Sequence, residues 1–433
     1  MKKLIAFFSL CLLGGNAFSQ VEHVVVITID GFRPDFYLDS SWKATQLRQL
    51  MNEGVHANGV NSVFPSMTYP SHTAIVTGVW PVKHGVYYNN PFEPNGSTGK
   101  NYWNDSSIKV PTVWSAAQAK GLKVASLLWP VSAGAPVMYN IPDIGSMGEK
   151  VREQYSTPAG FIEELKANVF NGASRLEYGK DHNIASIAAY VIKKDQPNLM
   201  TIHFFSVDHF EHEQGRQGAL VQAAIRDADS SVGIIADALK QAGIWDKTVL
   251  IVTGDHGFMD VSTVVNPNVW LTKAGLITDI KKDEWKAQFY SVGGSSYLYL
   301  KDKNDTQTLA QVENILANLT PEEKKYIRII SRKQLDKVGG NPEVALALSG
   351  ENGAAFGPAM SGDAIKPGHG GAHGYYPDFR EIRTGFVAYG PGVKKGAAIP
   401  EMNVRDVAAV IAHFLHLNLP GADGKVPAQL LAK

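Results

Sequence analysis

The sequence has one cysteine among its 433 residues, Cys11, and this cysteine lies close to the N-terminus. Disulfide bonds, thiol catalysis and cysteine-ligated zinc sites are therefore excluded for the rest of the chain. Basic and acidic residues number 41 each, so the chain has no excess of positive charge with which to wrap a nucleic acid. No stretch beyond the N-terminal region is apolar enough to predict a membrane span.

The first residues predict a secretory leader. Two lysines precede an apolar stretch over residues 4–13, and a small-residue exit follows at Ala17-Phe18-Ser19. This pattern is typical of a signal peptide, residues 1–19, that is cut before Gln20. Leu10 is too large for the position before a lipidated cysteine, which argues against a lipoprotein. We expect a secreted protein, with the bacterial periplasm as its compartment, and a mature chain free of cysteine.

Short apolar runs alternate with amphipathic stretches from Val24 onward. This alternation predicts an α/β fold with a mostly parallel central sheet and helices on both of its faces. The expected strands cover residues 24–29, 124–128, 199–205, 248–253 and 385–389. The expected helices cover residues 45–53, 70–76, 113–120, 185–194, 221–242 and 404–415.

Residues 20–433 are expected to form a single catalytic domain, but the pattern changes between about 266 and 360. Residues 290–300 alternate like a strand pair, and residues 306–319 and 321–326 have a helical pattern, so we predict a smaller α+β insertion there. Segments 89–109 and 130–150 are long, loop-like and aromatic, which often marks a surface that contacts substrate.

Potential metal ligands follow the two most apolar runs. Asp30 ends the first run, and Asp255-His256-Gly257 follows the second. In a parallel sheet, ligands bind beyond the carboxyl ends of the strands, which is where these side chains are expected. Asp30 alone could equally cap a helix, and Asp255-His256 could form a turn around a histidine whose hydrogen bonds are satisfied.

Two further segments offer ligands without a unique choice. Asp208 and His212 are four residues apart and share one face of a helix. His209 and Glu211 lie in the same stretch and compete with them. A glycine-rich segment contributes two more histidines, His369 and His373. Carboxylates and imidazoles in this mixture suit zinc, and enough of them are present for two ions.

Thr68 precedes Tyr69-Pro70 at the expected start of a helix. Backbone N–H groups at a helix N-terminus favour an anion such as phosphate. Thr68 could merely cap that helix. As a nucleophile activated by metal, however, it would account for the whole set of ligands together.

The chain resembles the nucleotide pyrophosphatase/phosphodiesterase family of the alkaline phosphatase superfamily. The resemblance rests on residues 28–35, 64–78, 80–89, 128–130, 253–259 and 371–377, and it extends from about residue 22 to about residue 420. It implies an alkaline-phosphatase-like fold and hydrolysis through a covalent threonine intermediate on Thr68. It also implies that two zinc ions are bound, one by Asp30, Thr68, Asp255 and His256 and the other by Asp208, His212 and His373.

The resemblance assigns substrate contacts as well. It implies that Asn89 donates a hydrogen bond to a phosphate oxygen and that Tyr69 packs against the base of a nucleotide. His72 and His84 match no ligand position, and we interpret them as structural.

No basic residue lies between Lys123 and Lys150, where related phosphatases carry residues that bind a phosphate dianion. This favours a phosphodiester or nucleotide as the small-molecule substrate, because a diester brings less charge. The aromatic residues Trp103, Trp129, Tyr102 and Tyr139 could line such a site or belong to the core. Alternatives are a phosphomonoesterase or phosphonate hydrolase on the same site, and a secreted metal-binding protein without catalysis. The physiological substrate, native metal and oligomeric state stay open.

Overall fold

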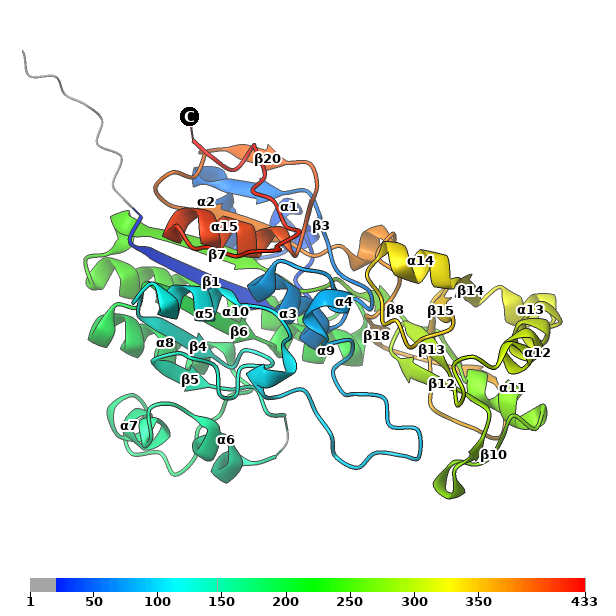
Figure 1. Ribbon diagram of the computed structural model, residues 1–433. Helices are drawn as coiled ribbons and strands as arrows, with labels where there is room; N and C mark the ends of the chain where they lie inside the picture. The colour runs from blue at the N-terminus through cyan, green and yellow to red at the C-terminus, as the bar shows by residue number, and fades with distance from the viewer. Residues whose placement is uncertain (1–20, 146, 433) are drawn as a thin grey trace, which may run out of the picture.

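The computed structural model describes residues 21–145 and 147–432 (Figure 1), so the leader predicted for residues 1–19 lies outside them. Its main body is built on an eight-stranded sheet in which, among the described strands, only β19 runs antiparallel to its neighbours. The predicted α/β class with a mostly parallel sheet is confirmed. In spatial order the strands are β20 (Ala397–Ile399), β2 (Val55–Ala57), β19 (Phe386–Tyr389), β7 (Thr248–Thr253), β1 (His23–Ile29), β6 (Leu199–Phe204), β4 (Val124–Leu127) and β5 (Tyr139–Ile141).

The central strands are nearly continuous apolar runs because both faces of the sheet are covered. Along β1, Val25 and Ile27 enter one hydrophobic cluster, while Val24 and Val26 enter the other. Alternate side chains of a strand point to opposite faces, so each run supplies both layers of the core at once.

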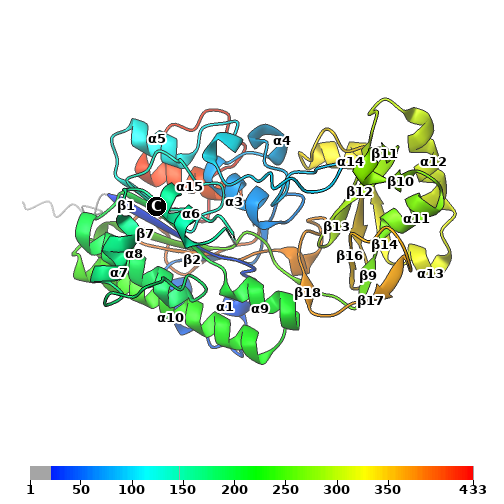
Figure 2. The ribbon, with the colours of Figure 1, turned by 90° about the horizontal axis from the view of Figure 1, so that it is seen from below.

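Helices form a layer on each face of this sheet (Figure 2). The first layer contains α2 (Thr45–Glu53), α7 (Phe161–Asn168), α8 (Asp181–Asp195) and α10 (Ala219–Gln241). The second layer contains α3 (Thr68–Thr77), α5 (Val113–Ala119) and α15 (Asp406–Leu415). The remaining elements of the main body are α1 (Asp35–Leu38), β3 (Val60–Asn61), α4 (Pro81–His84), α6 (Glu149–Tyr155), α9 (Ser206–Gln214), β8 (Met259–Asp260), β18 (Gly371–Ala372) and β21 (Met402–Asn403).

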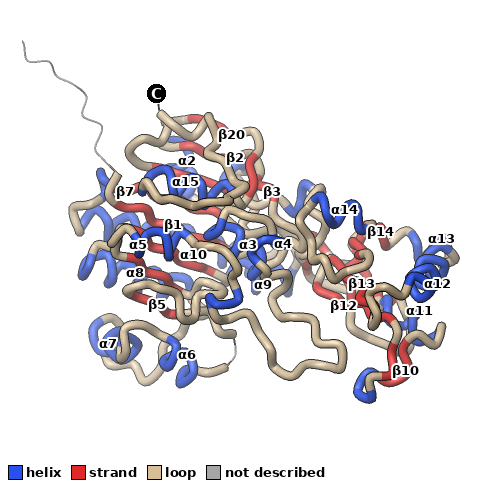
Figure 3. Tube along the Cα trace, in the orientation of Figure 1, coloured by secondary structure: helices blue, strands red, loops and turns tan. Residues whose placement is uncertain are grey.

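A second lobe with its own hydrophobic cluster stands beside the main body (Figures 1 and 3). Its antiparallel sheet has the order β12 (Ala287–Val292), β13 (Ser295–Leu300), β15 (Ala347–Gly350) and β14 (Ile327–Ile330). Around it lie β9 (Thr263–Val265), α11 (Pro267–Lys273), β10 (Ile277–Asp279), β11 (Glu284–Trp285), α12 (Thr306–Ala317), α13 (Pro321–Lys324), α14 (Arg332–Lys337), β16 (Ala354–Phe356) and β17 (Ile365–Pro367).

The structure corrects some of the expected boundaries. The segment 130–150 is not loop throughout, because it contains β5, which pairs with β4 at the edge of the central sheet. Helix α3 starts at Thr68 rather than at Pro70, so Thr68 lies in the first turn. Helix α8 starts four residues earlier than expected, at Asp181.

Within the described part of the chain, no helix is both long and apolar enough to cross a membrane.

Candidate metal centre and active site

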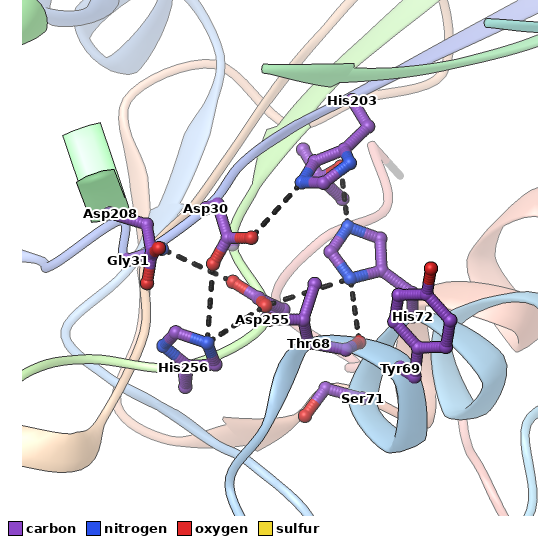
Figure 4. Close-up of polar contacts among 12 residues, drawn as sticks. Asp30, Gly31, Thr68, Tyr69, Ser71, His72, His203, Asp208, Asp255 and His256 are labelled. Atoms are coloured by element: carbon purple, nitrogen blue, oxygen red, sulfur yellow. Dashed lines mark hydrogen bonds and ion pairs between the residues drawn. The ribbon is translucent and has the colours of Figure 1, made fainter. Parts of the chain in front are cut away.

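The ends of β1 and β7 bring Asp30 and Asp255 together. The two strands pair in parallel, with Thr28 beside Thr253, so the residues that follow them emerge at the same edge of the sheet. Asp30, Asp255 and His256 form a buried group whose ligand atoms all lie within 4.8 Å of one another. The Nε2 atom of His256 is 3.2 Å from Asp30 Oδ1 and 3.1 Å from Asp255 Oδ2 (Figure 4).

A second group combines Asp208 and His212 of α9 with His373. The Oδ1 atom of Asp208 lies 3.5 Å from His212 Nε2 and 3.6 Å from His373 Nε2. His373 follows β18, which pairs with β8 just beyond the turn that carries His256. The rings of His256 and His373 consequently stack, with their centroids 3.7 Å apart, and the two groups adjoin.

Each of the three histidines in these groups directs its Nδ1 atom to a backbone carbonyl. His212 Nδ1 is 3.1 Å from Gly371 O, His256 Nδ1 is 3.1 Å from Gly257 O, and His373 Nδ1 is 3.0 Å from Ser66 O. A carbonyl only accepts, so these contacts assign the proton to Nδ1 and leave Nε2 as an unprotonated ligand atom. Burial supports this neutral form, because it lowers the pKa of His256 to about 4 and the pKa of His373 well below its usual value.

The carboxylates lack enough partners of their own. Among the described residues, Asp30 Oδ1, Asp208 Oδ1, Asp255 Oδ2 and His256 Nε2 are buried without a hydrogen bond. Burial, together with the charge of Asp30, raises the pKa of Asp208 and of Asp255 well above the usual value. Leaving such polar atoms unpaired is costly, and divalent cations would satisfy them. The residues present therefore fit metal ions with mixed oxygen and nitrogen ligands.

Thr68 faces the cavity that contains Asp30. It is the first residue of α3, whose N-cap is Met67, and no side-chain capping bond forms at this helix end. The alternative that Thr68 merely caps the helix thus finds no support. Thr68, Asp30 and Asn89 line a cavity of about 330 Å³. A hydroxyl so placed is available for reaction.

Asn89 and Tyr69 are linked through the first turn of α3. The backbone N–H of Tyr69 donates to Asn89 Oδ1 at 2.9 Å, which leaves the amide group of Asn89 as a donor at the cavity. The ring of Tyr69 runs along the cavity, and its hydroxyl donates to Asp143 Oδ2 at 3.2 Å. Both residues therefore line the same cavity as Thr68.

The residues that compete with these ligands in the sequence lie outside the two ligand groups. His209 and His369 are exposed and belong to neither ligand group. Glu211 is buried but turns away from the ligands to Arg33, whose Nε is 2.8 Å from Glu211 Oε1. Gly31, at φ 73°, makes room for this contact, because a Cβ there would meet Glu211 Oε2 at 2.6 Å. The Arg33–Glu211 pair thus joins the Asp30 turn to α9.

Two histidines that sequence reasoning left out of the site touch its ligands. His203 of β6 lies beside Thr28 of β1 in register, and its Nε2 is 3.1 Å from Asp30 Oδ2. His72 places Nδ1 2.8 Å from Thr68 O and 3.6 Å from Asp255 Oδ2. The only signal for His203 was a histidine inside an apolar strand, which by itself says nothing about its neighbour.

One basic residue does reach the cavity, although none lies between Lys123 and Lys150. Arg152, two positions beyond Lys150, lies on α6 and lines the same cavity as Thr68. The four candidate aromatic residues do not line it, whereas Tyr69 and Phe205 do. Trp129 and Tyr139 belong to the core, Tyr102 lines a different cavity, and Trp103 packs near Tyr69, Val86 and Val131.

Comparisons with known proteins define the class. Residues 24–375 match the family model of type I phosphodiesterase / nucleotide pyrophosphatase. This match covers most of the chain, so the protein belongs to that family, whose members are hydrolases of phosphodiester and pyrophosphate bonds.

Individual relatives are distant. The chain is 24% identical over 427 residues to human ectonucleotide pyrophosphatase/phosphodiesterase family member 5, covering 96% of this chain and 79% of that protein. It is 23% identical over 411 residues to rat member 3, covering 91% of this chain but only 42% of that protein. The solved structure of murine member 5, an inactive variant in complex with AMP, matches with a TM-score of 0.71 and 22% identity, over 95% of this chain and all of that one.

Proposed function

We propose that the protein is a secreted two-zinc phosphodiesterase or nucleotide pyrophosphatase that hydrolyses its substrate through a covalent intermediate on Thr68. The observation that carries this proposal is the placement of one free hydroxyl, that of Thr68, in the same cavity as the buried ligand Asp30. A protein that only stores metal gains nothing from a hydroxyl there. The AMP bound to the murine relative supports a nucleotide-sized substrate.

Asp30, Asp255, His256 and Thr68 would hold one zinc ion, and Asp208, His212 and His373 the other. When bound, the ions supply positive charge that neutralises the phosphoryl oxygens and favours ionisation of a bound hydroxyl or water. The carbonyl contacts to Nδ1 keep the three histidines in the tautomer that ligation needs.

The protein residues then act in two displacements. Thr68 Oγ1 forms a bond to phosphorus as the bond to the leaving oxygen breaks, and the hydroxyl proton passes to water. In the second displacement a water oxygen attacks phosphorus, the bond to Thr68 Oγ1 breaks, and the threonine is restored. One water is consumed overall.

Asn89 and the start of α3 orient the phosphoryl group. The amide of Asn89 offers N–H donors because its oxygen already accepts from Tyr69 N. Its donors would contact a phosphoryl oxygen on the side away from the carboxylates. His72 donates from Nδ1 to the backbone carbonyl of Thr68 and so fixes the turn that carries the nucleophile.

The experiment that tests the function compares zinc-loaded enzyme on the 4-nitrophenyl ester of thymidine 5′-phosphate and on 4-nitrophenyl phosphate. We expect a clear preference for the diester, with thymidine 5′-phosphate esterified to Thr68 through its phosphorus after rapid acid quenching. A preference for the monoester would make the protein a phosphatase, and a 4-nitrophenyl phosphonate tests the phosphonate alternative. If none of these compounds is turned over, the enzymatic proposal is wrong.

Secretion to the periplasm is part of the same proposal and rests on residues 1–19. N-terminal sequencing of the exported protein should begin at Gln20. A retained N-terminus would contradict it.

A further inference from the structure

The cavity that contains Thr68 has a second end. Of the residues that line it, Thr68 and Asn89 lie beside the backbone of Tyr69, Asp143 accepts from the Tyr69 hydroxyl, and Arg152 is linked to Asp143 through Gly145. Tyr69 connects the two ends, because its backbone N–H is bonded to Asn89 and its hydroxyl to Asp143. The far end is therefore separated from the reacting hydroxyl by about the length of a tyrosine side chain.

Arg152 is held in place at this far end by contacts that do not neutralise its positive charge. The guanidinium carbon lies 4.5 Å from the centre of the Tyr178 ring, and Nη2 donates to Gly145 O at 3.2 Å. Stacking of this kind fixes the plane of an arginine without neutralising it.

No acidic partner compensates Arg152 in residues 21–145 and 147–432, where no carboxylate oxygen lies within 4.0 Å of its guanidinium. Glu149, on the same helix, pairs instead with Lys166 at 2.9 Å. Asp143 is occupied as well, because it accepts hydrogen bonds from the Tyr69 hydroxyl and from Gly145 N at 3.1 Å. The Nε atom of Arg152 is buried and lacks a partner within the same residues.

We propose that Arg152 is a specificity-determining residue that binds a second phosphate group, carried by the organic substituent of the phosphodiester. This assignment rests on the proposed function, because it takes the Thr68 end of the cavity as the place of the scissile phosphate. Guanidinium groups bind phosphate through paired N–H donors, and the Nη donors of Arg152 not used by Gly145 are available for that. The cavity of about 330 Å³ suits a substituent no larger than a nucleoside with its phosphate.

The placement also explains why Arg152 need not make the enzyme a monoesterase. A residue that served the scissile phosphate would have to lie beside Thr68 and Asn89. Arg152 instead donates to Gly145 O, next to the Asp143 that accepts from the Tyr69 hydroxyl, so in this proposal it contacts the substituent. The preferred substrates are then diesters of nucleoside bisphosphates and similar doubly phosphorylated alcohols.

The test uses two matched compounds, the 4-nitrophenyl ester of thymidine 5′-phosphate with and without a 3′-phosphate. We expect the wild-type zinc enzyme to show a kcat/KM about tenfold higher for the 3′-phosphorylated compound, through a lower KM, as one charge-assisted contact provides. Arg152→Gln should abolish this preference, because it lowers kcat/KM about tenfold more on the 3′-phosphorylated compound than on the plain diester. Arg152→Lys should keep part of it, since the charge remains but the paired donors are lost.

Arg175→Gln is the matched control, because Arg175 is exposed and does not line the cavity. It should leave the preference unchanged. Equal losses on both compounds in Arg152→Gln would show that Arg152 only supports the fold through Tyr178, and a selective loss on 4-nitrophenyl phosphate would show that it binds the scissile phosphate. Either result, or no preference in the wild type, overturns the proposal.

A binding measurement separates this proposal from the enzymatic one. Calorimetry with zinc-loaded Thr68→Ala should give about tenfold tighter binding of thymidine 3′,5′-bisphosphate than of thymidine 5′-phosphate, and Arg152→Gln in that background should equalise the two. If wild type hydrolyses none of the compounds, the proposed function fails while this comparison still tests Arg152. Equal affinities in the Thr68→Ala protein would exclude the second-phosphate site.

Discussion

The two ligand groups are built from the same residue types but differ in how deeply they are buried and in the elements that hold them. Asp30, Asp255 and His256 follow two adjacent strands of the central sheet and are almost completely buried. In the other group the side chain of His212 is 46% exposed and that of Asp208 19% exposed. The first group is fixed by strand pairing, whereas the second depends on how α9 packs against the β18 segment. We therefore expect the first to be rigid and slow to exchange its metal, and the second to be open.

The largest expected effect is on chemistry at the buried group. Thr68→Ala should lower turnover by about a thousandfold or more, because the covalent step loses its nucleophile. Zinc content should stay near that of the wild type, since the carboxylates and imidazoles remain. Steady-state kinetics and metal analysis of the same preparation check both statements. Unchanged turnover would exclude the threonine mechanism.

The rates of zinc release should differ between the two ligand groups. After loading with two ions, a chelator should remove zinc in two phases, the faster from the half-exposed group. His212→Ala should eliminate the fast phase and lower the zinc affinity of that group by about tenfold to a hundredfold or more. His256→Ala should eliminate the slow phase. A chromogenic chelator in a stopped-flow instrument follows both. A single phase that neither variant changes would contradict the distinction.

The buried Arg33–Glu211 pair joins the two groups, and breaking it should affect both. Glu211→Gln leaves the Arg33 guanidinium, which is buried, without its closest counter-charge, and we expect a loss of about 3–5 kcal/mol in the free energy of unfolding. Both zinc affinities should fall together, because the pair holds α9 against the Asp30 turn. Urea unfolding with chelator titration measures this.

Asp35→Asn is the control for that variant. Asp35 contacts the same arginine at 3.1 Å but is 31% exposed and lies outside α9. We expect a loss of about 1 kcal/mol or less and unchanged zinc affinities. Equal effects of the two variants would mean that α9 is positioned by other contacts.

The last effect concerns pH in the metal-free protein. Burial lowers the pKa of His256 to about 4, whereas an unfolded histidine titrates near 6.5. As pH falls from about 6.5 to about 4 the unfolded chain binds the proton first, so stability is present above this window and about 3 kcal/mol is lost across it. His256→Gln should flatten that decline more than His212→Gln, since the side chain of His212 is half-exposed. Denaturant unfolding at several pH values, with chelator present, tests this order, and equal slopes in the two variants would contradict it.

Much of the buried group could be predicted because it depends on local pattern. A buried parallel strand is recognisable in the sequence as an apolar run. The residue that follows the run lies at the carboxyl edge of the sheet, where ligands bind. The positions of Asp30 and Asp255 follow from that rule, whereas the rule alone left open whether Asp30 binds a ligand or caps a helix. The four-residue spacing of Asp208 and His212 likewise needs only the geometry of a helix.

Residues that depend on contacts between distant segments could not be found in this way. His203 approaches Asp30 only because β6 is the neighbour of β1, and sequence pattern does not specify strand order. The choice of His373 over His369 depends on the pairing of β18 with β8, which turns the first toward Asp208 and leaves the second exposed.

The sequence by itself determined the class of chemistry, since the types and spacing of the carboxylates, imidazoles and the threonine are properties of the chain. It also determined the α/β layers, because strand and helix periodicity record which faces are buried. Only the tertiary structure decided which side chains share one cavity. Arg152 is the clearest case, because it is 84 residues from Thr68 in sequence and reaches the same cavity through the packing of α6 beside β5. Proximity between segments far apart in the chain is set by the balance of all their packing interactions, and no local pattern contains that balance.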